Sequence, residues 1–117
     1  MARFYRSRGW RVSGSDLARS EITDALRKNG IRVAIGPHRA ANVPAAASVV
    51  YSAAVRPDNP ELREARRRAI PTHSYAEAVG ELAEEYKTIA IAGAHGKSTT
   101  TALVGLVLVR GGLDPTV

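Results

Sequence analysis

A short segment near the C-terminal end of the sequence carries the residues best suited to chemistry. It reads Gly93-Ala94-His95-Gly96-Lys97-Ser98-Thr99-Thr100. The two glycines allow backbone conformations in which several N–H groups point toward one anion. Lys97 adds an ammonium for the β and γ phosphates of a nucleotide, and the Ser98 hydroxyl can ligate Mg²⁺ between them. The segment therefore predicts a site for a nucleoside triphosphate and its magnesium ion.

The flanking sequence predicts the two elements that such a loop needs. Residues 88–92 are apolar and partly β-branched, as is typical of a strand buried in a parallel sheet. Residues 98–109 favour a helix, which Gly111-Gly112 can end. Such a helix offers its unpaired N–H groups and the positive end of its dipole to the anion.

The spacing of the loop departs from that of the general P-loop. Two residues separate Gly93 from Gly96-Lys97, where the general motif has four. A Gly-Lys-Ser sequence also occurs by chance in many proteins. Its position at a predicted strand-to-helix junction favours the phosphate site over a chance match.

Composition excludes several functional classes. The 117 residues have a formal charge of +6, and the basic cluster of Arg63 and Arg66–Arg68 shares its predicted helix with Glu61 and Glu64. That pattern is typical of a solvated helix face, and the few aromatic residues offer little for base stacking, so no nucleic-acid partner is expected. Without cysteine, disulfides and thiolate metal sites are excluded. No stretch approaches the ~20 apolar residues of a membrane span, and we expect a cytoplasmic protein.

The order of elements predicts an α/β fold. Strands are predicted at residues 10–12, 31–35, 48–51 and 70–72, and helices end at Gly9 and run from Ser20 to Gly30, from Asn59 to Ala69 and from Ser74 to about Glu85. Regular alternation with short connections indicates a parallel, doubly wound, Rossmann-like sheet over residues 1–85 that lacks its first strand. Residues 86–117 are expected to begin a second, truncated P-loop ATPase domain, since one strand and one helix are too few for such a domain.

Helix starts carry clear local signals. Ser20 is a good N-cap, and the helix that it opens is expected to carry Ile22, Ala25 and Leu26 on one apolar face. Asn59 is followed by Pro60 at the first helical position, where a missing N–H costs nothing. Ser74 and Glu77 have the spacing of a capping box.

Polar residues follow several predicted strands. Ser15 and Asp16 lie in a polar turn predicted at residues 13–16, where they could serve the turn alone or meet a ribose or sugar hydroxyl. His38 has no metal-ligand spacing to another histidine and is expected at the surface. An alanine-rich turn is predicted at residues 40–47.

The tight loop after an apolar strand resembles the ATP-binding loop of the muramyl ligases, and its histidine is most similar to the alanine-adding branch of that family. The resemblance extends over nearly the whole sequence through residues 12–16, Gly30-Ile31, residues 49–55, Asp58-Asn59-Pro60-Glu61 and Ile70-Pro71. The Asp-Asn-Pro-Glu segment favours the alanine-adding branch over the branch that reattaches recycled peptides.

The resemblance implies a reaction, its substrates and its site residues. ATP would phosphorylate the carboxylate of UDP-N-acetylmuramate, and the amine of L-alanine would displace the phosphate to form an amide. Residues 93–100 would bind ATP, with Lys97 as the catalytic residue and Ser98 as a Mg²⁺ ligand. Ser15, Asp16 and Ser52 would line the UDP-sugar edge.

Two alternatives stay open at this stage. One is a non-catalytic module that binds a nucleotide or another anion, and the other is a different muramyl ligase, such as the recycled-peptide ligase. The ligase interpretation expects an acidic metal ligand, an adenine pocket and an amino-acid-binding domain beyond Val117, so that these 117 residues alone would be inactive.

Overall fold

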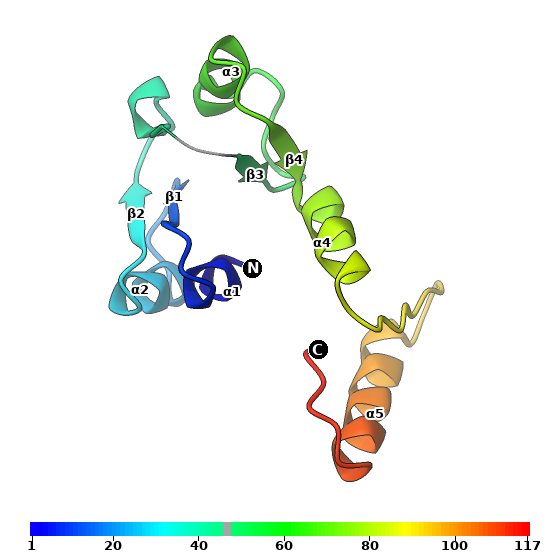
Figure 1. Cartoon of the computed structure of the whole chain (residues 1–117). Helices are drawn as coiled ribbons and strands as arrows, with labels where there is room; N and C mark the ends of the chain where they lie inside the picture. Colours follow the sequence, from blue (N-terminus) through cyan, green and yellow to red (C-terminus); the bar gives the residue numbers. More distant parts are fainter. Residues whose placement is uncertain (46–47) are drawn as a thin grey trace. The chain divides into compact units, whose positions relative to one another are not determined.

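The computed structural model describes residues 1–45 and 48–117, which form two compact units, residues 1–82 and 83–117. The elements are α1 (Ala2–Ser7), β1 (Ser13–Asp16), α2 (Glu21–Lys28), β2 (Arg32–Ile35), the 3-10 turn η1 (Ala40–Asn42), β3 (Val49–Tyr51), α3 (Pro60–Arg67), β4 (Thr72–Ser74), α4 (Tyr75–Glu84) and α5 (Lys97–Arg110) (Figure 1). The predicted α/β class is confirmed.

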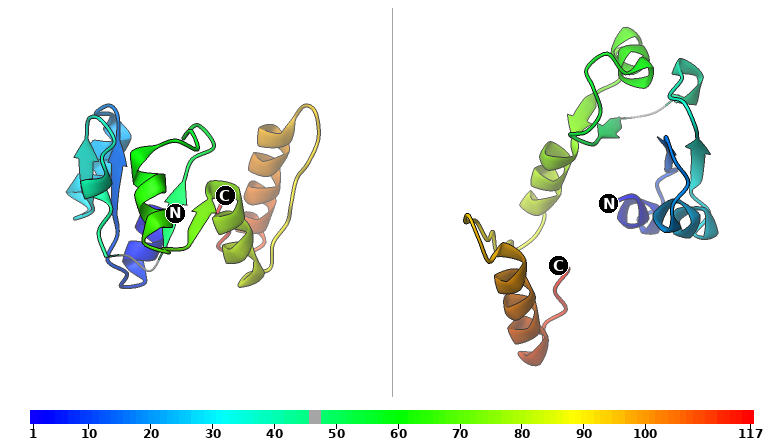
Figure 2. Two further views of the ribbon diagram at one scale, coloured as in Figure 1. Left: turned by 90° about the horizontal axis from the view of Figure 1, so that it is seen from above. Right: turned by 180° about the vertical axis from the view of Figure 1, so that it is seen from behind.

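The strands pair in parallel, but they do not form one sheet. β1 pairs with β2 from Ser13–Arg32 to Asp16–Ile35, and β3 pairs with β4, so that the strands of each pair lie side by side in every view (Figure 1; Figure 2). The parallel pairing predicted for this region is confirmed. The single continuous sheet is not observed, because no strand among the described residues pairs with both two-stranded sheets.

Two predicted strands are wrong. The first strand is not residues 10–12 but β1, which lies in the segment predicted as a polar turn, because pairing with β2 and not side-chain polarity determines where the ladder forms. Residues 88–92 form no strand. A strand buried in a parallel sheet needs hydrogen-bonded neighbours, and no described strand pairs with this segment.

The small core belongs to the first unit. Its buried apolar side chains are Ile31, Val33, Val43, Leu62, Ala65 and Ala78. Helix α2 buries Thr23 and half-buries Ala25 and Leu26, as expected of an apolar face, but it leaves Ile22 73% exposed, so the prediction is wrong for Ile22. Arg27 ties α2 to β2 because its Nη2 atom donates to the Val33 carbonyl at 2.7 Å.

The helix starts match their local signals. Ser20 Oγ accepts from the Thr23 N–H, and Ser74 and Glu77 form the predicted capping box. Asn59 Oδ1 accepts from the Glu61 N–H at 2.8 Å, with Pro60 as the first residue of α3. Each signal acts over three residues or fewer, so the sequence specifies it directly.

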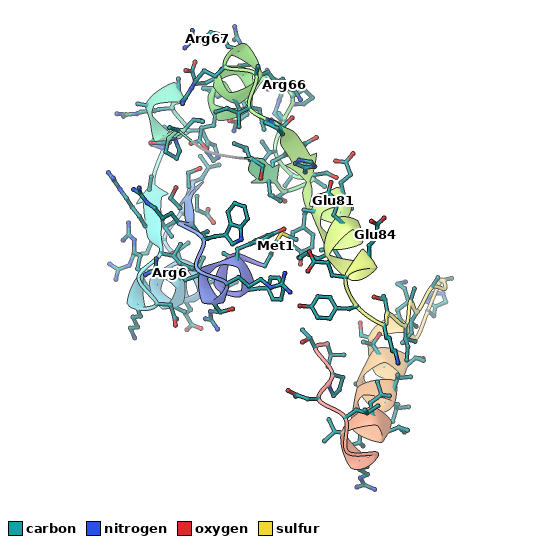
Figure 3. All side chains as sticks on the ribbon, viewed as in Figure 1. Met1, Arg6, Arg66, Arg67, Glu81 and Glu84 are labelled. Atoms are coloured by element: carbon teal, nitrogen blue, oxygen red, sulfur yellow. The ribbon has the colours of Figure 1, made fainter. Side chains whose placement is uncertain are left out.

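Charged side chains cover the outer part of α3. Arg66 and Arg67 both extend from this helix (Figure 3), and the exposed Arg67 forms an ion pair with the half-buried Glu64. The predicted ion pairing within this helix is thus confirmed for Arg67 and Glu64, although Glu64 is not solvated as expected. Over residues 1–45 and 48–117, every helix is too short or too polar to cross a lipid bilayer.

Replacing Asn59 tests how much the N-cap of α3 contributes to the stability of the first unit. Asn59→Ala should lower the free energy of unfolding by about 1 kcal/mol, because the Glu61 N–H loses its side-chain acceptor. Asp58→Ala, which removes only an exposed ion pair with Arg56, is the control and should change it by less than about 0.5 kcal/mol. Urea denaturation followed by circular dichroism measures both, and equal losses would contradict the capping role.

Candidate functional site

The phosphate-loop residues come together at the start of α5, in the second unit. Gly96 is the N-cap residue and has φ 75°, a left-handed conformation that residues with a Cβ rarely adopt. Because glycine has no side chain to cap the helix, the first N–H groups of α5 remain available to an anion. The predicted helix is confirmed, and it begins at Lys97, one residue earlier than expected.

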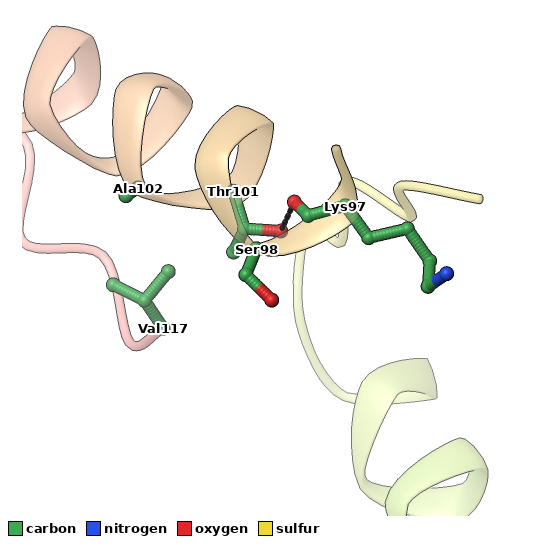
Figure 4. A pocket seen from close by; sticks show the side chains of 5 residues that line it. All are labelled: Lys97, Ser98, Thr101, Ala102 and Val117. Atoms are coloured by element: carbon green, nitrogen blue, oxygen red, sulfur yellow. Dashed lines mark hydrogen bonds between the residues drawn. The ribbon is translucent and has the colours of Figure 1, made fainter. Parts of the chain in front are cut away.

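The ammonium of Lys97 bonds to its own loop. Its Nζ atom donates to the carbonyl of Gly93 at 2.7 Å and to that of Ala94 at 3.3 Å. The side chain extends away from the Ser98 hydroxyl (Figure 4). Lys97 and Ser98 are therefore adjacent but not directed at one common point, and Lys97 would have to exchange these carbonyls for phosphate oxygens.

A wide, open hollow of about 460 Å³ lies beside the first turns of α5. Its lining residues are Lys97, Ser98, Thr101, Ala102 and Val117 (Figure 4). Thr101 directs its hydroxyl to the Lys97 carbonyl at 2.9 Å, so this side chain serves the helix. Residues 93–100, including His95, Thr99 and Thr100, are all exposed. The hollow is large enough for a phosphate group beside the Ser98 side chain.

The residues fit a phosphate better than they fit a complete metal site. A helix start capped by glycine, with a lysine beside it, offers donors and positive charge. Ser98 could supply one oxygen to Mg²⁺, and the described residues contain no cluster of three or more His, Cys, Asp or Glu side chains that could hold a metal ion. Ser98 would hold the ion together with the phosphates.

The residues predicted for the UDP-sugar edge lie in the first unit, on two different sheets. Ser15 and Asp16 belong to β1, and Ser52 directly follows β3. Asp16 Oδ1 accepts from the Ala18 N–H at 3.2 Å, and Ser52 Oγ accepts from the Ala54 N–H at 3.3 Å. Asp16 and Ser52 thus both stabilise turns, whereas the Ser15 side chain is half-buried and takes part in a network.

The network is centred on Glu61 and was not anticipated. Ser15 Oγ donates to Glu61 Oε2 at 2.5 Å, Asn42 Nδ2 donates to Oε1 at 2.7 Å, and His38 Nδ1 lies 3.1 Å from Oε1. These four residues, named here the Glu61 network, join β1, the loop after β2, η1 and the first turn of α3. The side chains of His38 and Glu61 are only 19% and 16% exposed, so the prediction of His38 as a surface residue is wrong.

Sequence reasoning missed this network because its members lie far apart in the chain. Ser15 and Glu61 are separated by 46 residues, and no local spacing connects them. One signal could have indicated it: the loops that follow parallel strands gather at one edge of a sheet. Residues 36–42 lie in such a loop. The alanine-rich turn predicted there begins with η1, while residues 46 and 47 lie outside the described residues.

The network keeps Glu61 ionised. Burial by itself raises the pKa of Glu61, but hydrogen bonds from Ser15, Asn42 and His38 outweigh it, so the pKa lies below its ordinary value of 4.5. The position of Glu61 in the first turn of α3 also favours negative charge.

The direction of this pKa shift predicts how stability changes with acid. A carboxyl group whose pKa is lower in the folded state stabilises the fold fully above the unfolded pKa, and this contribution disappears as pH falls through the folded pKa. The difference in unfolding free energy between wild type and Glu61→Gln should therefore be largest near neutral pH and shrink below about pH 4.5. Urea denaturation from about pH 7 to about pH 3 measures it.

A matched control distinguishes the network from surface charge. Asp58→Asn, just before the same helix, removes an ion pair whose Arg56 and Asp58 side chains are 84% and 69% exposed, and it should change stability by less than about 0.5 kcal/mol at every pH. A difference for Glu61→Gln that stayed constant with pH would contradict the ionised network.

Comparison with known proteins relates nearly the whole chain to one family. The chain is 55% identical over 108 residues to the UDP-N-acetylmuramate–L-alanine ligase of Burkholderia multivorans and 54% identical to that of Burkholderia ambifaria. Each match covers 92% of this chain and 23% of the relative, so the chain spans less than a quarter of the length of these curated relatives.

A solved structure agrees with these relatives. The crystal structure of a UDP-N-acetylmuramate-alanine ligase from Thermotoga maritima matches 93% of this chain and 26% of its own, with a TM-score of 0.80 and 38% identity. The family model described as the Mur ligase family, catalytic domain, matches residues 1–87. Since that match covers most of the 117 residues, the chain belongs to the Mur ligase family.

Proposed function

We propose that the protein carrying this sequence is an ATP-dependent ligase that joins L-alanine to UDP-N-acetylmuramate during the synthesis of peptidoglycan precursors. The observation that carries the proposal is the 55% identity to a ligase named for this reaction, over a segment that includes Gly-Lys-Ser-Thr at the start of α5. Because the chain spans 23% of that relative, the activity is proposed for the whole protein.

The chemistry requires activation of a poor acyl donor. A carboxylate oxygen of UDP-N-acetylmuramate attacks the γ-phosphorus of ATP, and ADP leaves. The amine of L-alanine then attacks the acyl carbon of this mixed anhydride, phosphate leaves, and the amine gives up a proton as the amide forms. The protein's part is to position the reactants and to stabilise the charge on the transferring phosphoryl group.

Residues of the second unit are proposed for the ATP site. The free N–H groups at the start of α5 and the loop residues Gly93 to Thr100 would bind the phosphates. Lys97 would stabilise the charge that develops during transfer, and the Ser98 hydroxyl would help to hold Mg²⁺, which would supply further positive charge to the phosphates. We infer that this unit begins a P-loop domain whose remaining parts cover the exposed apolar side chains of α5, among them Leu103, Leu106 and Val107.

Residues of the first unit are proposed for the UDP-sugar. Its parallel strand pairs support a Rossmann-like arrangement, in which ligands bind beyond the carboxyl ends of the strands. Ser15 and Asp16 lie at that end of β1, and Ser52 follows the corresponding end of β3. A sugar nucleotide bound there would contact side chains from both strand pairs.

Removing the Lys97 ammonium tests whether ATP binds to the second unit and the UDP-sugar to the first. In the full-length protein carrying this sequence, Lys97→Ala should lower L-alanine-dependent ATP hydrolysis at least about 100-fold, because the phosphoryl charge loses its nearest cation. Binding of UDP-N-acetylmuramate, measured by calorimetry, should stay within about twofold of wild type.

Lys87→Ala is the matched control, since Lys87 is an exposed lysine of the same unit outside the loop. This variant should retain both L-alanine-dependent ATP hydrolysis and the binding of UDP-N-acetylmuramate. Loss of sugar-nucleotide binding together with hydrolysis in Lys97→Ala would mean that the two sites are assigned to the wrong units.

A further inference from the structure

The Glu61 network determines where each of its protons lies. A carboxylate that is ionised can only accept hydrogen bonds. Asn42 Nδ2 donates to Oε1, and Ser15 Oγ lies 2.5 Å from Oε2. The single proton of the Ser15 hydroxyl must therefore point to Glu61, because the short oxygen–oxygen contact needs a donor and Glu61 has none.

His38 cannot take the Ser15 proton in place of Glu61. Its Nδ1 atom lies 3.1 Å from Glu61 Oε1 and 3.4 Å from Ser15 Oγ. Because Oε1 is an acceptor, Nδ1 must itself carry a proton in this contact. A protonated ring nitrogen has no lone pair to offer, so the Ser15 hydroxyl has Glu61 as its acceptor within the network.

We propose that Glu61 is a positioning residue that leaves Ser15 able only to accept a hydrogen bond from the sugar nucleotide. This inference rests on the function proposed above and specifies which part of the substrate Ser15 meets. Phosphate oxygens only accept at neutral pH, so they cannot pair with a hydroxyl whose proton is already engaged. Ser15 is therefore assigned to a donor group of the substrate, a ribose or sugar hydroxyl or a base N–H, and not to the diphosphate.

The hydrogen bond from Ser15 to Glu61 also makes Ser15 selective between hydrogen-bond donors and anions. A serine free to rotate would donate to a phosphate or accept from a hydroxyl, and it would discriminate weakly between them. With its proton held by Glu61, Ser15 favours a ligand that carries a donor at this point and disfavours an anion there. His38 and Asn42 strengthen the effect because they occupy Oε1, which leaves Oε2 for Ser15.

The first measurement needs no substrate. Long-range proton–nitrogen NMR of this chain at about pH 8, where an ordinary histidine is neutral, reports which ring nitrogen of His38 carries the proton. The Nδ1–H form is expected in wild type, with a shift toward Nε2–H in Glu61→Gln. An Nε2–H form in wild type would overturn the proposal, because Nδ1 could then accept the Ser15 proton.

The second measurement uses the full-length protein. Ser15→Ala and Glu61→Gln should each raise the KM for UDP-N-acetylmuramate about tenfold while kcat and the KM for ATP stay within about twofold. Inorganic pyrophosphate, which lacks the hydroxyl and base donors, should compete equally well in all variants. Weaker competition by pyrophosphate in Ser15→Ala would overturn the assignment of Ser15 to a donor group.

The double variant tests whether Glu61 acts through Ser15. In a Ser15→Ala background, Glu61→Gln should raise the KM for UDP-N-acetylmuramate by at most about a further twofold. A second tenfold rise in this KM would show that Glu61 acts independently of Ser15 and would overturn the positioning role. Glu64→Gln on the same helix is the control and should match wild type. If circular dichroism shows that Glu61→Gln does not fold, the proposal is still tested by pyrophosphate competition in Ser15→Ala and by the ring nitrogen of His38 that carries the proton in wild type.

The two proposals can fail separately. If the unsubstituted full-length protein does not ligate L-alanine to UDP-N-acetylmuramate, the proposed function is wrong, and with it the assignment of Ser15 to that substrate. If ligation is observed and His38 carries its proton on Nε2, the function stands and the role of Glu61 is wrong.

Discussion

A single carboxylate, that of Glu61, holds together the segments on which the first unit depends. Its strands are only three or four residues long, and two-stranded sheets of this size are marginal by themselves. Glu61 connects β1, the loop after β2, η1 and α3 through three side chains that all donate to it. An unpaired carboxylate in this half-buried position would be costly, so the arrangement is stable only when all of these segments are in place.

The two units offer different interactions to the ligands proposed for them. In the second unit, the start of α5 offers backbone N–H groups and a dipole, which suit the diffuse negative charge of phosphates. In the first unit, side chains are oriented by one another, which suits a ligand whose hydroxyl and N–H groups have direction. This division agrees with the function proposed for this member of the Mur ligase family, in which ATP would be bound through its phosphates and UDP-N-acetylmuramate through its sugar nucleotide.

Local chemistry explains which parts of the fold could be predicted. The caps at Ser20, Asn59 and Ser74 were all recognisable because each involves neighbours within three residues. The start of α5 at Gly96-Lys97 was recognisable for the same reason. The position of β1 was not, because a parallel ladder is defined by a partner some 19 residues away. Residues 88–92 have the composition of a strand and form none, because composition supplies no partner.

By itself, the sequence determined the α/β class, the approximate helix boundaries and the glycine-capped start of α5, since these follow from neighbouring residues and backbone preference. The sequence also indicated Ser15 as a candidate for the UDP-sugar edge, but not whether its hydroxyl donates or accepts a hydrogen bond there. Only the tertiary structure decided that His38 is half-buried, that Glu61 accepts three hydrogen bonds and that the Ser15 proton is already engaged. The physical reason is that the direction of a hydrogen bond depends on which groups meet in space, and these groups come from four segments spread over 46 residues.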